Sequence, residues 1–285
     1  MRKLSDSFMD ALKTGFLAPL TVQVREDQDL DLQIREDYLN IYYKGNSLLK
    51  LDQVGAGRYR PDVHTKFTGG VEIPDFVDLD STAAFINRVP QIKENIIRFG
   101  KSSLEIEYEQ MIIRANNYER RNNSEYFIVD RQYVLPREGR IDLAGFYWPG
   151  GQRSKGQVVQ PCLMEIKFAL NKEIQDIHDQ VDRYYQAVHD KAAEIAEELE
   201  TILRQKLALG LFDLPANCLA AMETLTFARD IDQFQFIVIL VDYNPRSKLY
   251  RRSQLAGLPF ASQVRIFESG FAMWESKMRS VSTDG

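Results

Sequence analysis

Two short stretches of the sequence, Gly139-Arg140-Ile141-Asp142-Leu143 and Leu163-Met164-Glu165-Ile166-Lys167-Phe168, decide the expected fold. Both are largely apolar and bounded by turn residues, which is typical of β-strands. Side chains alternate between the two faces of a strand, so Glu165 and Lys167 share one face while apolar residues point to the other. If the two strands pair as a hairpin, Asp142 lies beside Glu165. The sequence therefore predicts two neighbouring carboxylates with an ammonium group next to them.

Hydrophobic periodicity places these two strands within a longer alternation of helices and strands. We expect helices over 102–117, 172–209 and 246–255, and strands over 126–135, 140–148, 162–168, 235–242 and 263–267. This order predicts an α/β fold, with a mixed central sheet flanked by helices. A long polar loop, 149–160, separates the second and third of these strands, so their pairing is an assumption on which the site depends.

The sequence pattern of the first 90 residues differs from that of the rest, and we interpret this region as a β-rich accessory part. An amphipathic helix is expected over 1–20, and apolar runs on both sides of Lys44-Gly45-Asn46 predict a β-hairpin. Residues 52–80 are rich in glycine and proline, which indicates an irregular connection. The predicted division is therefore an N-terminal part over 1–90 and a larger α/β domain over 91–285.

Composition is that of an ordinary globular protein and excludes several classes. The 285 residues are 44% hydrophobic and carry a formal net charge of −5, which provides no overall attraction to a polyanion. The two cysteines, Cys162 and Cys218, are too few for a disulfide framework or a four-cysteine zinc site. No apolar run reaches membrane-spanning length, and the N-terminus lacks the apolar core of a signal peptide. We therefore expect a cytoplasmic protein without a membrane partner.

The predicted pair of carboxylates with a lysine suits the hydrolysis of phosphodiester bonds. Two carboxylates hold a hard divalent cation such as Mg²⁺ or Mn²⁺, and a neighbouring ammonium group orients water and shares the developing charge. A Glu-x-Lys triplet also occurs by chance, and Glu275-Ser276-Lys277 is a second example in a polar tail. The alternative interpretation is therefore a solvated strand face, which the apolar neighbours of Glu165 disfavour.

With its order of elements, the region 102–267 resembles the PD-(D/E)XK nuclease superfamily, which has a restriction-endonuclease-like α-β-β-β-α-β core. Gly139-Arg140-Ile141-Asp142 is similar to the second-strand motif of RecB-like members, and Gln180-x-x-x-Tyr184 to their Gln-Tyr motif. The resemblance implies that Asp142, Glu165 and the Ile166 carbonyl hold Mg²⁺ and that Lys167 positions the attacking water. It also implies supporting roles for Gln180 and Tyr184. The alternative is that Tyr184 is a core residue and Gln180 merely flanks it.

Many members of this superfamily carry a glutamate on the first core helix, and this chain offers Glu105, Glu107 and Glu109. Glu105 borders the apolar stripe expected for the helix, whereas Glu109 is expected further round it. We therefore predict Glu105 as the helix carboxylate, followed by Glu107. The alternative is a solvated acidic face near the start of the helix.

Basic residues offer a path for a nucleic-acid partner. Arg140 belongs to a group of arginines between the first core helix and the second strand, which ordinary surface charge explains equally well. The cluster Arg246, Lys248 and Arg251 follows the apolar strand 235–242. No sequence motif of a triad hydrolase, a P-loop enzyme or a zinc site is present. The resemblance favours DNA as the substrate, in defence or repair.

Two further interpretations stay open. The chain is alternatively a catalytically inactive module of the same fold, used for nucleic-acid binding or protein assembly. The helix expected over 172–209 also offers a seam for a homodimer or a partner protein.

Overall fold

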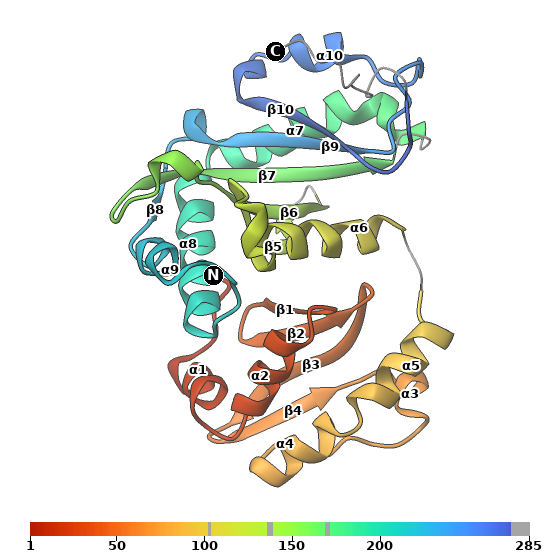
Figure 1. Ribbon diagram of the computed structural model, residues 1–285, viewed down its shortest axis with the longest axis vertical. Coiled ribbons are helices and arrows are strands. Elements are labelled where there is room, and N and C mark those ends of the chain that lie inside the picture. Colours follow the sequence, from red (N-terminus) through yellow and green to blue (C-terminus); the bar gives the residue numbers. More distant parts are fainter. Residues whose placement is uncertain (102–103, 136–138, 169–171, 275–285) are drawn as a thin grey trace, which may run out of the picture.

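The chain builds two β-sheets, with helices packed against both of them (Figure 1). The computed structural model describes residues 1–101, 104–135, 139–168 and 172–274. A four-stranded antiparallel sheet lies in the N-terminal part, and a six-stranded mixed sheet lies in the remainder. The fold is therefore mixed α/β, as predicted.

The N-terminal sheet is a meander in which each strand pairs with the next. Its strands are β1 (Leu30–Ile34), β2 (Tyr38–Tyr43), β3 (Asn46–Gly55) and β4 (Arg58–Asp62). Lys44 and Gly45 join β2 to β3 with φ values of 44° and 72°, the left-handed geometry that a two-residue hairpin turn requires. The predicted hairpin is confirmed. The prediction of an irregular segment over 52–80 is wrong in its first half, because a second tight turn at Ala56-Gly57 returns the chain into β4.

Five helices cover the N-terminal sheet in the described part of the chain. They are α1 (Asp6–Lys13), α2 (Ala18–Glu26), α3 (Thr65–Thr68), α4 (Leu79–Ile86) and α5 (Val89–Phe99). The prediction of a single helix over 1–20 is wrong, because the chain turns around Gly15 between α1 and α2. Helix α5 packs against α3 and β3, so packing on the N-terminal sheet continues beyond residue 90.

The six-stranded sheet follows the predicted strands closely. It contains β5 (Tyr126–Leu135), β6 (Gly139–Tyr147), β7 (Val158–Phe168), β8 (Thr226–Phe227), β9 (Gln235–Val241) and β10 (Val264–Ser269). Its order is β10-β9-β7-β6-β5, and β8 pairs with one end of β7. Strands β5, β6 and β7 are antiparallel to one another in the order β5-β6-β7, whereas β7, β9 and β10 are mutually parallel. The expected hairpin of β6 and β7 is thus confirmed.

Helices cover both faces of this sheet. They are α6 (Leu104–Ile113), which continues as a π-helix (Arg114–Tyr118), α7 (Ile177–His189), α8 (Ala192–Ala208), α9 (Ala216–Met222) and α10 (Arg252–Ala256). Single turns of 3₁₀-helix lie at Arg120–Asn122, Gly150–Gln152, Lys172–Asp176, Ile231–Gln233 and Ala261–Gln263. Apolar residues of α7 and α8 pack on one face with Leu163 and Val238, and Ile113 of α6 packs on the other with Met164 and Ile166. This arrangement is the usual way of burying a strand on both sides.

Two predicted helices differ from the structure. The helix expected over 172–209 is interrupted between α7 and α8 at Asp190-Lys191, and the apolar stripes of both helices are buried in the chain's own core. These stripes therefore offer no seam to a second copy. The basic helix expected over 246–255 is reduced to α10, because the side chains of Asn244 and Ser247 accept hydrogen bonds from the backbone and favour turns. In the described ranges, no helix has the length and apolar character needed to cross a membrane.

Candidate active site

The site begins where β6 and β7 separate. Their pairing runs from Tyr147 opposite Gln160 to Leu143 opposite Met164, and the next residues along are Asp142 and Glu165. Beyond this point the Asp142 side chain replaces the strand contact, because its Oδ2 accepts a hydrogen bond of 2.8 Å from the Ile166 backbone N–H. The register is the one the site requires, and the two carboxylates lie on neighbouring strands.

Glu165 is held by three side chains. Its Oε1 lies 2.8 Å from Lys167 Nζ and accepts a hydrogen bond of 2.6 Å from Gln180 Nε2. Its Oε2 lies 3.0 Å from the Tyr184 hydroxyl, which also accepts a hydrogen bond of 2.6 Å from Gln180. Tyr184 is buried, so it is a core residue as well as a partner of the carboxylate. The structure thus brings four of the predicted residues together: Glu165, Lys167, Gln180 and Tyr184.

Glu109 of α6 is linked to this centre by hydrogen bonds. Its side chain is fully buried, and its Oε1 accepts a hydrogen bond of 2.7 Å from Gln132, which also donates to Asp142 Oδ1 at 3.3 Å. The expectation that Glu109 lies further round the helix is wrong. The apolar residues of α6 are distributed around the helix, and two of them, Leu104 and Met111, are exposed. The helical spacing of apolar residues therefore did not identify the face of α6 that is buried.

The other two glutamates of α6 lie differently. Glu105 is half-buried and close enough for its charge to act on Asp142, Glu109 and Lys167. Glu107 lines a separate cavity with Lys44 and Arg114, away from Asp142. The selection of Glu105 stays a prediction, and Glu109 joins it as a candidate.

Gln132 is a site residue that the sequence did not indicate. It lies within β5 with φ of 52°, in the left-handed region that a non-glycine residue seldom adopts. The β5–β6 register shifts between Ile128 and Asp130, so the strand is irregular just before this residue. The resulting backbone directs the Gln132 amide between two carboxylates. A single glutamine in an alternating strand carries no sequence signal for such a role.

The electrostatics of the site follow from burying several carboxylates together. Burial, then the neighbouring charges of Glu165, Glu109 and Glu105, raises the pKa of Asp142, although the Ile166 N–H opposes this. Burial also raises the pKa of Glu109 to about 7 against the effect of Arg131. For Lys167, burial alone would lower the pKa, but the Glu165 charge and its hydrogen bond outweigh burial and raise it. The site therefore favours protons or another cation.

The donor set suits a hard cation, since it consists of carboxylate oxygens with a backbone carbonyl nearby on β7. Asp142 and Glu165 provide two such groups, whereas Glu109 Oε2 is buried in an ion pair with Arg131 at 3.1 Å. Within the described ranges, no three His, Cys, Asp or Glu side chains are grouped as a metal site. Two carboxylates with water as the other ligands are a donor set that Mg²⁺ commonly accepts.

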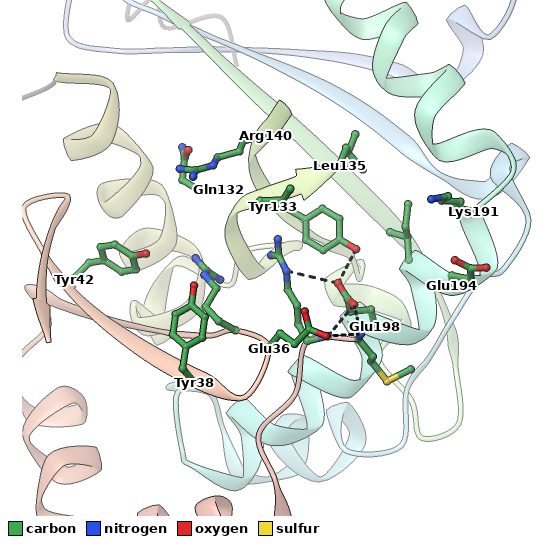
Figure 2. Close-up of a pocket in the computed structure, with 15 residues that line it drawn as sticks. Glu36, Tyr38, Tyr42, Gln132, Tyr133, Leu135, Arg140, Lys191, Glu194 and Glu198 are labelled. Atoms are coloured by element: carbon green, nitrogen blue, oxygen red, sulfur yellow. Dashed lines mark hydrogen bonds and ion pairs between the residues drawn. The ribbon is translucent and has the colours of Figure 1, made fainter. Parts of the chain in front are cut away.

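A cleft of about 480 Å³ lies between the two sheets (Figure 2), and Gln132, whose amide donates to Asp142, is among its lining residues. Gln132 and Arg140 lie along it from the six-stranded sheet, and Tyr38 and Tyr42 contribute from β2. Arg140 is exposed there. The predicted cluster Arg246, Lys248 and Arg251 is also exposed, in the segment after β9. Because β7 and β9 are parallel, this segment leaves the same edge of the sheet as Lys167.

Comparison with protein-family models, curated proteins and solved structures finds no match for this chain.

Proposed function

We propose that the protein is a metal-dependent nuclease with a restriction-endonuclease-like core. The observation that carries the proposal is the placement of Asp142 and Glu165 at the point where β6 and β7 separate, with Lys167 on Glu165. The element order α6-β5-β6-β7-α7-β9, with α8, α9 and β8 inserted between α7 and β9, supports the same core. Gln180 and Tyr184 on α7 contact Glu165, as the motif resemblance implies.

In this proposal each side chain has a distinct task. Asp142, Glu165 and the Ile166 carbonyl hold Mg²⁺ or Mn²⁺, which supplies charge neutralisation at the phosphoryl oxygens and activates water. Lys167 positions the attacking water and shares the developing negative charge. Gln180 and Tyr184 fix the Glu165 carboxylate, and such supporting contacts commonly tune metal affinity.

We further propose that the substrate is DNA and that the protein acts in cytoplasmic defence or repair. Arg140 beside the site and the exposed cluster after β9 offer contacts to phosphate groups. Residues 1–90 are the accessory part in this proposal. The net charge of −5 makes these local cations, together with the bound metal, responsible for holding a polyanion.

The proposal is tested by incubating plasmid, linear and single-stranded DNA, and RNA, with the protein in Mg²⁺ or Mn²⁺. Cleavage that is lost in Asp142→Asn and Lys167→Met supports it. The matched control is Glu200→Gln, because Glu200 is also a largely buried carboxylate with basic partners but lies on α8 away from the site. Equal activity in all four proteins would identify a contaminating nuclease and contradict the assignment.

The second candidate is an inactive module of the same fold. The observation that favours it is that the described residues contain no group of three side chains suited to a metal. Calorimetric titration with Mn²⁺ separates the two candidates. Binding that Asp142→Asn abolishes supports the nuclease, whereas absence of binding, combined with retained DNA affinity, supports the module.

A further inference from the structure

The face of β1 that points away from the N-terminal core is charged and buried against the six-stranded sheet. Asp31 and Gln33 lie on this face, Arg35 follows directly after the strand, and all three are buried. Strand β1 lies against β5, which contributes Asp130 and Arg131 to the contact (Figure 1). Burying so many charged groups is costly unless each has a partner, so each of these groups should be paired.

One route of contacts leads from β1 into the candidate site. Arg131 Nη1 lies 3.2 Å from Asp31 Oδ2, and Arg131 Nη2 lies 3.1 Å from Glu109 Oε2. Glu109 in turn shares the Gln132 amide with Asp142. The guanidinium of Arg131 therefore bridges a carboxylate of the N-terminal sheet and a carboxylate of the site.

The position of Asp31 is itself fixed from the other side. Its Oδ1 accepts a hydrogen bond of 2.6 Å from Gln33 Nε2, and Gln33 Oε1 accepts one of 2.9 Å from Lys206 on α8. The Tyr42 ring lies 4.8 Å from the Arg131 guanidinium. Arg131 is consequently held by an acid and a ring from the N-terminal sheet while it contacts Glu109.

Helix α6 has further contacts with the same sheet. The Gln110 side chain donates a hydrogen bond to the Asp29 carbonyl just before β1. Gly45, in the β2–β3 turn, lies so close to Ile106 that an added Cβ would be 1.7 Å from Cγ2. These contacts hold the helix that carries Glu109 at the edge of the N-terminal sheet.

We propose that Asp31 and Arg131 are positioning residues of the candidate site: Asp31 orients Arg131, and Arg131 holds Glu109 beside Asp142. The inference rests on the proposed function and extends it, because it makes the N-terminal sheet a component of the metal centre. Without the Asp31 charge, the Arg131 side chain is less constrained in position. Its positive charge beside Glu109 is also no longer partly neutralised by Asp31. Both effects weaken cation binding.

The experiment measures the affinity for Mn²⁺ by calorimetry in the full chain and in Asp31→Asn, Glu109→Gln and the double variant. We expect affinity to fall roughly 10-fold in Asp31→Asn, the lower end of the range for outer-sphere partners. In the Glu109→Gln background the same substitution should change affinity by less than about 2-fold, because its effect passes through Glu109.

The control is Asp130→Asn, which removes an equally buried charge of the same inter-sheet contact. Asp130 pairs with Arg2 and Arg35 and makes no ion pair with the Arg131 guanidinium. The Asp130→Asn variant should have a lower Tm but an Mn²⁺ affinity close to that of the unmodified protein. If Asp31→Asn does not fold, Arg131→Lys replaces it, because lysine keeps the charge but lacks the fork that bridges two carboxylates.

The outcomes separate the inference from the function on which it rests. Equal losses of affinity in Asp31→Asn and Asp130→Asn, or additive losses with Glu109→Gln, would overturn the positioning role while leaving the metal site intact. Failure of the unmodified protein to bind Mn²⁺ would overturn both. A loss specific to Asp31→Asn that disappears in the Glu109→Gln background supports the proposal.

Discussion

The backbone N–H of Ile166 donates a hydrogen bond of 2.8 Å to Asp142 Oδ2. This contact lies one residue beyond the last pair of the β6–β7 ladder, so a side chain takes the place of a strand partner. It fixes the Asp142 carboxylate beside Glu165 while both are removed from water. Burial and the nearby Glu165 charge together raise the pKa of Asp142.

Asp142→Asn should stabilise the metal-free protein at high pH. The pKa of Asp142 is raised on folding, so the folded state binds more protons and its stability falls as pH rises above the ordinary aspartate range. Asparagine stays neutral and avoids this loss. In EDTA at pH 8.5 we expect a Tm increase of about 2–4 °C, shrinking toward zero near pH 4. A lower Tm for the variant at pH 8.5 would contradict the argument.

Mn²⁺ binding should tighten as pH rises from 6 to 8.5. Burial and neighbouring carboxylates raise the pKa of Asp142, and the pKa of Glu109 is about 7, so protons compete with the metal through this range. We expect roughly a 10-fold gain in affinity, with release of protons on binding. Calorimetry in buffers of different ionisation enthalpy measures that release. An affinity independent of pH would show that these carboxylates do not hold the ion.

Lys167→Met should abolish cleavage but keep metal binding. Lys167 and Glu165 form a nearly buried pair at 2.8 Å, so the variant leaves a buried carboxylate with only its neutral partners. We expect cleavage to fall about 10²- to 10⁴-fold. The free energy of unfolding should fall by about 2–4 kcal/mol, and Mg²⁺ should raise the stability of the variant by more than it raises that of the unmodified protein.

The control for this variant is Lys93→Met. Lys93 also lies 2.8 Å from a carboxylate, that of Asp27, but on α5. It should retain full cleavage activity. If both lysine variants lose cleavage equally, the loss reflects folding and not the role assigned to Lys167.

Tyr184→Phe and Tyr185→Phe form a matched pair of adjacent substitutions. The Tyr184 hydroxyl contacts Glu165 at 3.0 Å, whereas the Tyr185 ring stacks on Phe260 at 3.9 Å between centroids. Removing the first hydroxyl should cost about 1 kcal/mol of stability and weaken Mn²⁺ affinity roughly 10-fold. Tyr185→Phe should change neither quantity. Equal affinities in titrations of the two variants would remove Tyr184 from the site.

Gly45→Ala should be more destabilising than Gly57→Ala, although both glycines have positive φ values of 72° and 65°. An added Cβ at Gly45 meets Ile106 of α6, whereas nothing lies within 4 Å at Gly57. Both variants incur the backbone cost of about 1 kcal/mol, and Gly45→Ala should lose about 1–3 kcal/mol more. Urea denaturation measures the difference. Equal losses would show that the turn does not press on α6.

Prediction succeeded where local chemistry decides structure. The turn residues Lys44-Gly45 specified a hairpin, and β5 has the predicted bounds, because turn geometry and alternating strands depend on adjacent residues. Prediction failed where side chains compete for the backbone, as in the turns around Asn244 and Ser247. The break between α7 and α8 was also missed, because the apolar spacing continues through it.

The sequence by itself determined the pair of strands and the residues of the Asp142, Glu165 and Lys167 centre. Period-two alternation and hairpin pairing suffice for that result, since both are local rules. Only the tertiary structure decided that Glu109 and Gln132 join this centre and that Asp31 reaches it through Arg131. These contacts depend on an irregular strand and on the packing of two sheets, and both bring together residues far apart in the chain. A buried charge is stable only beside its partner, and that partner is known only once the chain has folded.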